Sequence, residues 1–94
     1  MTINSVDITS CRETVLKILT TEMTPKSHRA EFDDDTVYFS VGILEECDPE
    51  WILAQARDRR YPFEGRANLA RNMVHFRNEL WSELRQENPD LPPL

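Results

Sequence analysis

The last third of the chain carries a continuous apolar repeat of helical period, from Gly65 to Glu87. Its large apolar side chains recur every three or four residues, the spacing that places them on one side of an α-helix: Leu69, Met73, Phe76, Leu80 and Leu84. No proline interrupts the repeat, and Asn88-Pro89 ends it because proline cannot continue a helix. A helix over these residues would be roughly 35 Å long. The sequence therefore predicts one long C-terminal helix on which the other elements pack.

A first helix is predicted over residues 5–23, where Ile8, Cys11, Val15 and Ile18 form a second apolar stripe of helical spacing. Thr24-Pro25 ends it. Its start is left open between an early cap, at Ser5 or Asp7, and a later capping box formed by Ser10 and Glu13.

A third helix is predicted from Asp48-Pro49-Glu50 to about residue 60. Aspartate suits the N-cap, proline suits the first helical position, and the positive end of the helix dipole favours the following carboxylate. Tyr61-Pro62 ends this helix before the long C-terminal one begins.

Residues 36–44 alternate with a period of two, which indicates a β-strand with Val37, Phe39, Val41 and Ile43 on one face. Residues 28–32 alternate weakly, and the Asp33–Asp35 run between the two stretches is good turn chemistry. The sequence predicts a β-hairpin of 28–32 with 36–44. A two-stranded hairpin is marginal alone, so this one would lie against the helices.

These elements, in the order α-β-β-α-α, predict an α+β domain in which a small antiparallel hairpin packs on helices. A chain of 94 residues holds one core, so residues 1–94 are interpreted as a single domain with frayed tails at 1–4 and 88–94. No apolar run approaches the roughly 18 residues that span a bilayer, and no signal peptide is recognisable. Cys11 and Cys47 lack CxxC companions, which favours a reduced, cytoplasmic protein with Cys11 in the core.

No catalytic or cofactor-binding pattern is found. His28 and His75 lie in different elements, and the Asp33–Asp35 run lacks the ligand spacing of a calcium loop. The two glycines, Gly42 and Gly65, cannot form a phosphate-binding loop. We therefore expect no enzyme activity, no metal and no cofactor. A metal or acid–base site that joins His28 to the aspartates is the weaker alternative.

Charge is distributed unevenly along the chain. Residues 1–50 carry eleven acids and four bases, whereas residues 51–94 carry six acids and seven arginines. Helix starts and turns explain part of the acidic excess. The rest suggests a surface that imitates phosphates and binds a basic protein. The candidate residues of this acidic surface are Glu31, Asp33, Asp34, Asp35, Glu45, Glu46 and Asp48.

Six arginines lie between Arg57 and Arg77, against only Asp58 and Glu64. Pairing with acids of the same chain is the simplest interpretation. Contacts with a protein partner and weak RNA or DNA binding are the alternatives, because a guanidinium group suits both carboxylate and phosphate. The net charge of −6 counts against nucleic acid.

The long C-terminal helix offers a second candidate interface, with Trp81 as an exposed anchor because tryptophan and arginine dominate interface energies. Its residues are Arg71, Val74, Arg77 and Trp81. The leading hypothesis is a non-enzymatic protein-binding module: a stoichiometric inhibitor or adaptor, of the kind that phages and mobile elements carry against nucleic-acid-binding proteins. The alternative is an accessory subunit or homodimer that assembles through the long helix.

Overall fold

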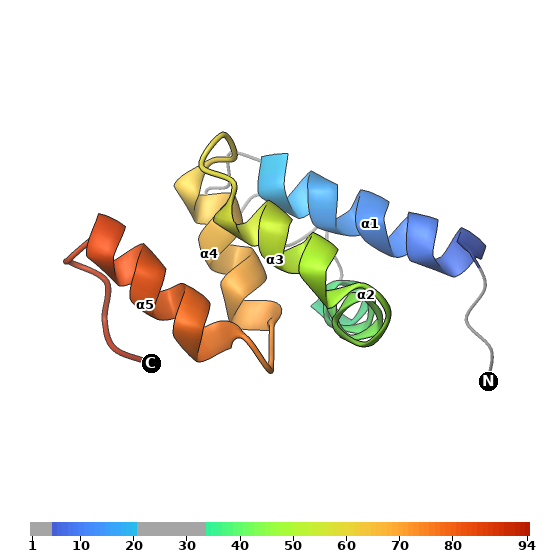
Figure 1. Cartoon of the computed structure of the whole chain (residues 1–94). Coiled ribbons are helices and arrows are strands. Elements are labelled where there is room, and N and C mark those ends of the chain that lie inside the picture. Colours follow the sequence, from blue (N-terminus) through green and yellow to red (C-terminus); the bar gives the residue numbers. More distant parts are fainter. Residues whose placement is uncertain (1–4, 21–33) are drawn as a thin grey trace.

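The structure is a computed structural model that describes residues 5–20 and 34–94 (Figure 1). These ranges contain five helices and no strand: α1 (Ser5–Thr20), α2 (Asp34–Cys47), α3 (Pro49–Arg57), α4 (Phe63–Asn72) and α5 (Arg77–Glu87). The predicted α+β fold is therefore wrong for the described part of the chain, which is entirely helical.

The predicted strand over 36–44 lies inside α2. Its buried residues Val37, Val41 and Leu44 are four and three residues apart, so they form one side of a helix. Val37 and Val41 fit a period of two as well, and a short apolar run rich in β-branched residues is ambiguous for that reason. Phe39, which the strand would have placed beside them, is exposed. The second strand of the hairpin, 28–32, lies outside the described residues.

The predicted long C-terminal helix is also wrong, because it is broken into α4 and α5 at residues 73–76. Met73 adopts extended backbone angles (φ −83°, ψ 127°). The Val74 N–H then donates to Glu45 Oε1 at 2.6 Å, so a side chain of α2 replaces the helical acceptor. The break lets α5 lie beside α4 instead of continuing it (Figure 1).

The other two predicted helices are confirmed. α1 follows the early start at Ser5, and the predicted residues 21–23 lie outside the described part of the chain. α3 has Asp48 at its N-cap position and Pro49 as its first residue, although it ends at Arg57 rather than near residue 60.

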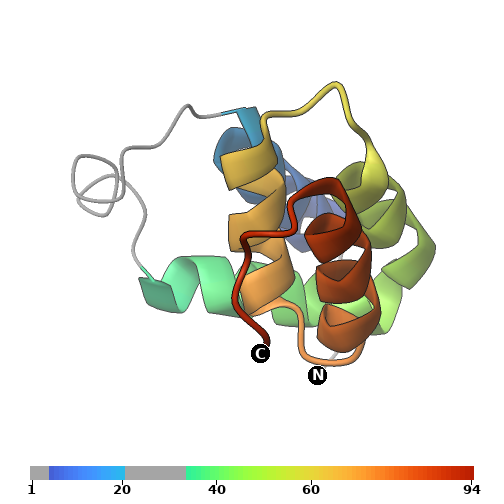
Figure 2. The same cartoon turned by 90° about the vertical axis from the view of Figure 1, so that its left-hand side faces the viewer.

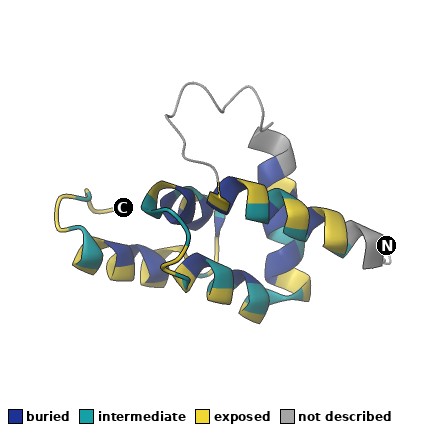
Figure 3. Cartoon of the chain, turned by 90° about the horizontal axis from the view of Figure 1, so that it is seen from above, coloured by how far each residue is buried: buried dark blue, intermediate teal, exposed yellow. Residues whose placement is uncertain are grey.

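The core lies between α1, α2, α3 and α4, with α5 packed on α4 at one end of the molecule. Buried bands run along the inward sides of the helices (Figure 3). The predicted core positions Cys11, Leu69, Met73, Leu80 and Leu84 are all buried. Periodicity therefore identified four of the five stripe residues of the C-terminal third as buried, but Phe76 is only partly buried, and neither the burial of Trp81 nor the break in the helix was predicted.

α1 and α4 cross closely at Gly65. A Cβ added to Gly65 would lie 2.8 Å from Leu19 Cα and closer still to the Leu19 carbonyl oxygen. Real Cβ atoms do not approach a backbone so closely, so only glycine allows this crossing.

None of the helices in the described ranges is long and apolar enough to cross a membrane.

Candidate functional site

The predicted acidic surface is divided by the structure. Glu31 and Asp33 lie outside the described residues, and Asp34 and Asp35 are the first two residues of α2. Glu46 is exposed near the other end of that helix. Glu45 and Asp48 have partners within the chain, so they contribute less to an external surface than the sequence suggested.

Glu45 is buried on the inner side of α2. Its carboxylate accepts the Val74 N–H at 2.6 Å, which ties α2 to the segment between α4 and α5. A charged acceptor makes such a bond stronger than one between neutral groups. Glu45 is thus a structural residue in this fold.

Asp48 forms an ion pair with Arg12 of α1. The Arg12 guanidinium also lies 5.2 Å from the centre of the Trp51 ring, within the range of a cation–π contact. These contacts join the start of α3 to α1, because Asp48 and Trp51 flank that start.

The outer face of α2 carries two large aromatic side chains that pack on no core. Tyr38 is 58% exposed and Phe39 is 67% exposed. Gly42 follows one turn later and exposed Glu46 one turn after that. We call Tyr38, Phe39, Gly42 and Glu46 the α2 outer face. The first turns of α2 project beyond α4 (Figure 2).

Sequence reasoning missed this face because it read α2 as a strand and assigned Phe39 to the core side. A helical reading of the same residues separates them correctly: Val37, Val41 and Leu44 point inward, and Phe39 lies opposite. The sequence prediction for this region rested on the acids at both ends of the stretch.

α2 carries four carboxylates, on Asp34, Asp35, Glu45 and Glu46, and no basic residue. The Glu45 carboxylate is bound to the Val74 N–H on the inner side of the helix, and Glu46 is exposed. The exposed aromatic residues therefore lie on a helix that has acidic residues near both ends and no basic residue.

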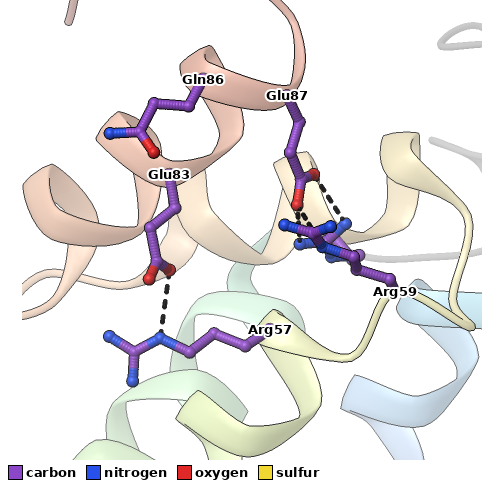
Figure 4. A pocket seen from close by; sticks show the side chains of 6 residues that line it. Arg57, Arg59, Glu83, Gln86 and Glu87 are labelled. Atoms are coloured by element: carbon purple, nitrogen blue, oxygen red, sulfur yellow. Dashed lines mark hydrogen bonds and ion pairs between the residues drawn. The ribbon is translucent and has the colours of Figure 1, made fainter.

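A shallow cleft of about 420 Å³ against α5 is lined by Arg57, Arg59 and Arg66, which come from α3, the segment after it and α4 (Figure 4). Arg57 pairs with Glu79 at 2.7 Å and with Glu83 at 3.1 Å. Arg59 pairs with Glu87 at 2.7 Å. The two glutamates beside Arg57 raise its pKa, Glu83 more than Glu79.

Arg66 is the buried member of this arginine cluster, with only 4% of its surface exposed. Its Nε donates to the Ala56 carbonyl oxygen at 2.9 Å, and its Nη1 lies 3.1 Å from Glu87 Oε2. One side chain on α4 thereby joins the end of α3 to the end of α5.

Asp58 and Arg60 form a local pair after α3. The Asp58 carboxylate accepts hydrogen bonds from the Arg60 side chain, at 2.8 Å from Nη2, and from the Arg60 backbone N–H at 3.0 Å. The Arg60 side chain is the main reason that the pKa of Asp58 is lowered to about 2.

Pairing within the chain is therefore confirmed for Arg57, Arg59, Arg60 and Arg66. Their partners are the acids of the C-terminal half and not the acidic excess of the first half. The cleft is electrostatically satisfied by its own side chains, which leaves little attraction for a nucleic-acid phosphate.

The second predicted interface is not one surface. Trp81 is only 5% exposed, and its Nε1–H donates to the Pro92 carbonyl oxygen at 2.8 Å, so it is not the exposed anchor expected from the sequence. The Arg71 guanidinium lies 5.7 Å from the centre of the Trp81 ring. Val74, 58% exposed, and Arg77 remain on the surface beside the helix break.

The described residues contain no group of three or more histidine, cysteine, aspartate or glutamate side chains that could hold a metal ion. His28 lies outside them. His75 is exposed, and its ring meets Phe76 edge to face with centroids 6.3 Å apart. Cys11 is buried and Cys47 is exposed, and both thiols are free.

Comparison with protein-family models finds no matching family, and comparisons with curated proteins and with solved structures find no match.

Proposed function

We propose that this protein is a non-enzymatic protein-binding module, a stoichiometric inhibitor or adaptor, that binds its partner through the α2 outer face. The observation that carries the proposal is the exposure of Tyr38 and Phe39 on a helix that has four carboxylates and no base. The proposal keeps the acidic region identified from the sequence and adds to it the aromatic residues that would supply the binding energy.

Energetic reasoning favours aromatic side chains as the anchors. Full burial of a phenylalanine side chain contributes about 1.5–3 kcal/mol, and aromatic residues are enriched among those that dominate binding energy. Phe39 obtains only a minor part of this stabilisation within its own chain, because it is 67% exposed. A partner that covers it would therefore gain most of the burial energy.

The charge on α2 favours a basic partner. Complementary charge accelerates association and rejects partners of the same sign. A nucleic-acid-binding protein presents such a surface, and an acidic module that covers it acts as an inhibitor. We place this activity in the cytoplasm, where the exposed Cys47 thiol stays reduced.

The arginine cluster supports nucleic-acid binding less well. Arg57, Arg59 and Arg66 already contact glutamates, so phosphate would have to displace carboxylates that the fold holds in place. Assembly through the C-terminal helix has less support as well, because Trp81 is buried against its own chain.

A pull-down with matched variants tests the proposal. Tagged wild type, a Tyr38→Ser/Phe39→Ser double variant and Val74→Ser are compared in nuclease-treated lysate at low and moderate salt. Val74 is the control because it is as exposed as Tyr38 and is not part of the α2 outer face. Wild type and Val74→Ser should retain one stoichiometric protein, and the double variant should lose at least about tenfold of it.

All three proteins should melt at similar temperatures, because surface substitutions outside packed sites change stability little. Equal recovery of the partner by the double variant contradicts the proposal. Recovery that depends on nucleic acid, or recovery of only the tagged protein itself, contradicts it too.

A further inference from the structure

The chain has two glycines, and both lie inside helices. Glycine weakens a helix relative to alanine, so a glycine in a helix interior requires a reason. At Gly65 a Cβ atom would collide with the backbone of Leu19. Glycine is therefore needed there for the close crossing of α1 and α4.

Gly42 has no such reason within the described residues. Beyond its own helix and chain neighbours, no described atom lies within 4 Å of a Cβ built at Gly42. No described glycine has a positive φ, so the backbone of α2 does not require it either. Gly42 nevertheless lies at the middle of the α2 outer face, one turn from Tyr38 and Phe39 on one side and from Glu46 on the other.

We infer that the α2 outer face binds a basic amphipathic helix of the partner, which crosses α2 over Gly42 as α1 crosses α4 over Gly65. This inference rests on the proposed function and specifies the partner's binding element. Without a side chain at residue 42 the two helix backbones can approach closely. Tyr38 and Phe39 would then lie against the apolar stripe of the incoming helix, the arrangement by which amphipathic helices are commonly recognised.

The incoming helix should be basic because α2 offers carboxylates at both ends and no base. Asp34 and Asp35 begin the helix, and exposed Glu46 lies in its last turn. A second copy of this face would place acid against acid, whether the two α2 helices ran parallel or antiparallel, and like charges oppose association. The charge pattern therefore selects a different, basic chain as the occupant.

The test is a selection of displayed helical peptides, each about 20 residues long with randomised charge and apolar positions, on the folded wild-type protein. Enriched peptides should carry net positive charge and apolar residues at helical spacing, and their binding should weaken as salt rises. Gly42→Leu should reduce their affinity by at least about tenfold, because the leucine side chain occupies the crossing point.

Gly42→Leu is a clean variant for this purpose, because leucine favours helix and the position is open, so the melting temperature should stay equal or rise. Phe39→Ser serves as the second variant. Weaker binding to Phe39→Ser with unchanged binding to Gly42→Leu would retain the α2 outer face and overturn the helix crossing.

Unchanged binding to both variants would overturn the proposed function together with this inference. Enrichment of neutral or acidic peptides, or the absence of any enriched peptide, would overturn the assignment of a basic helix. Self-association of the wild type that Gly42→Leu abolishes, measured by sedimentation, would replace the basic partner with a second copy.

Discussion

The α1–α4 crossing and the α2 outer face present the same local feature in two settings. Each contains a glycine within a helix: Gly65 in the first turn of α4 and Gly42 in the interior of α2. In the first setting a neighbouring backbone fills the space that a side chain would need, whereas in the second no described atom does. No packing within the described residues therefore requires a glycine at position 42, which leaves a partner outside the chain as its reason.

The α1–α4 crossing and the α2 outer face also differ in how their charged side chains are paired. Beside the crossing, Arg66 is buried and fully engaged with Ala56 and Glu87. Around α2, negative charge accumulates with no base on the helix to balance it. The described ion pairs satisfy the arginine side, whereas among the described residues only the Glu45 and Asp48 carboxylates of the acidic side have partners, and substitutions should respond accordingly.

Arg66→Ala should have the largest effect on stability. The substitution leaves the buried Ala56 carbonyl oxygen without its donor and removes the link between α3, α4 and α5. Breaking a buried, hydrogen-bonded charge pair costs about 3 kcal/mol or more. Urea denaturation measures this loss, with Arg60→Ala as the exposed control. Equal stability of the two variants would show that the Arg66 network contributes nothing.

Gly65→Ala should cause the next largest loss of stability, about 2 kcal/mol, because the added methyl group forces α1 away from α4. The same denaturation curves report it. A Gly65→Ala protein as stable as wild type would contradict the close crossing and would remove the basis for comparing the two glycines.

Gly42→Ala should act in the opposite direction and stabilise the protein by about 1 kcal/mol, since alanine favours helix and the site is open. Thermal and urea denaturation both test this sign. Destabilisation would mean that Gly42 is needed inside the fold, so the contrast with Gly65 would disappear.

The smallest effect concerns Asp58. Hydrogen bonds from Arg60 hold the pKa of Asp58 at about 2, below its value in the unfolded chain. A lowered carboxyl pKa stabilises the folded state at neutral pH, and that contribution is lost as pH falls from about 4 towards 2. NMR titration should place the Asp58 midpoint near 2 in wild type and higher in Arg60→Ala, although still below the ordinary value because the backbone N–H of residue 60 remains as a donor. An unchanged midpoint in the variant would show that the Arg60 side chain is not the cause.

Sequence reasoning succeeded where local chemistry decides the structure. The Asp48-Pro49 start of α3 and the stripe along α1 depend on residues close in sequence, and both helices formed where expected. Sequence reasoning failed where a residue distant in sequence determines the local structure. Nothing near Val74 indicates that Glu45 will accept its N–H and break the C-terminal helix.

The candidate site likewise has features that local sequence reveals and features that depend on the fold. The acidic character of residues 34–48 is visible in the composition, and on that basis the sequence predicted a binding surface there. Which carboxylates face outward depends on whether the segment is a helix or a strand, because a change of period moves Phe39 from the core to the surface. Burial of Glu45, and with it the exposure of the aromatic residues, could not be assigned before that choice was made.

The bond between Glu45 and Val74 has a consequence for hydrogen exchange. Amides in the short segments between helices usually exchange quickly, since they face water. The Val74 amide donates to the carboxylate of a buried glutamate, so it should exchange more slowly than those of His75 and its neighbours. Its protection reports directly on the contact between α2 and the segment before α5. Binding of a partner to the outer side of α2 should therefore change the exchange rate of the Val74 amide, although the partner makes no contact with that amide.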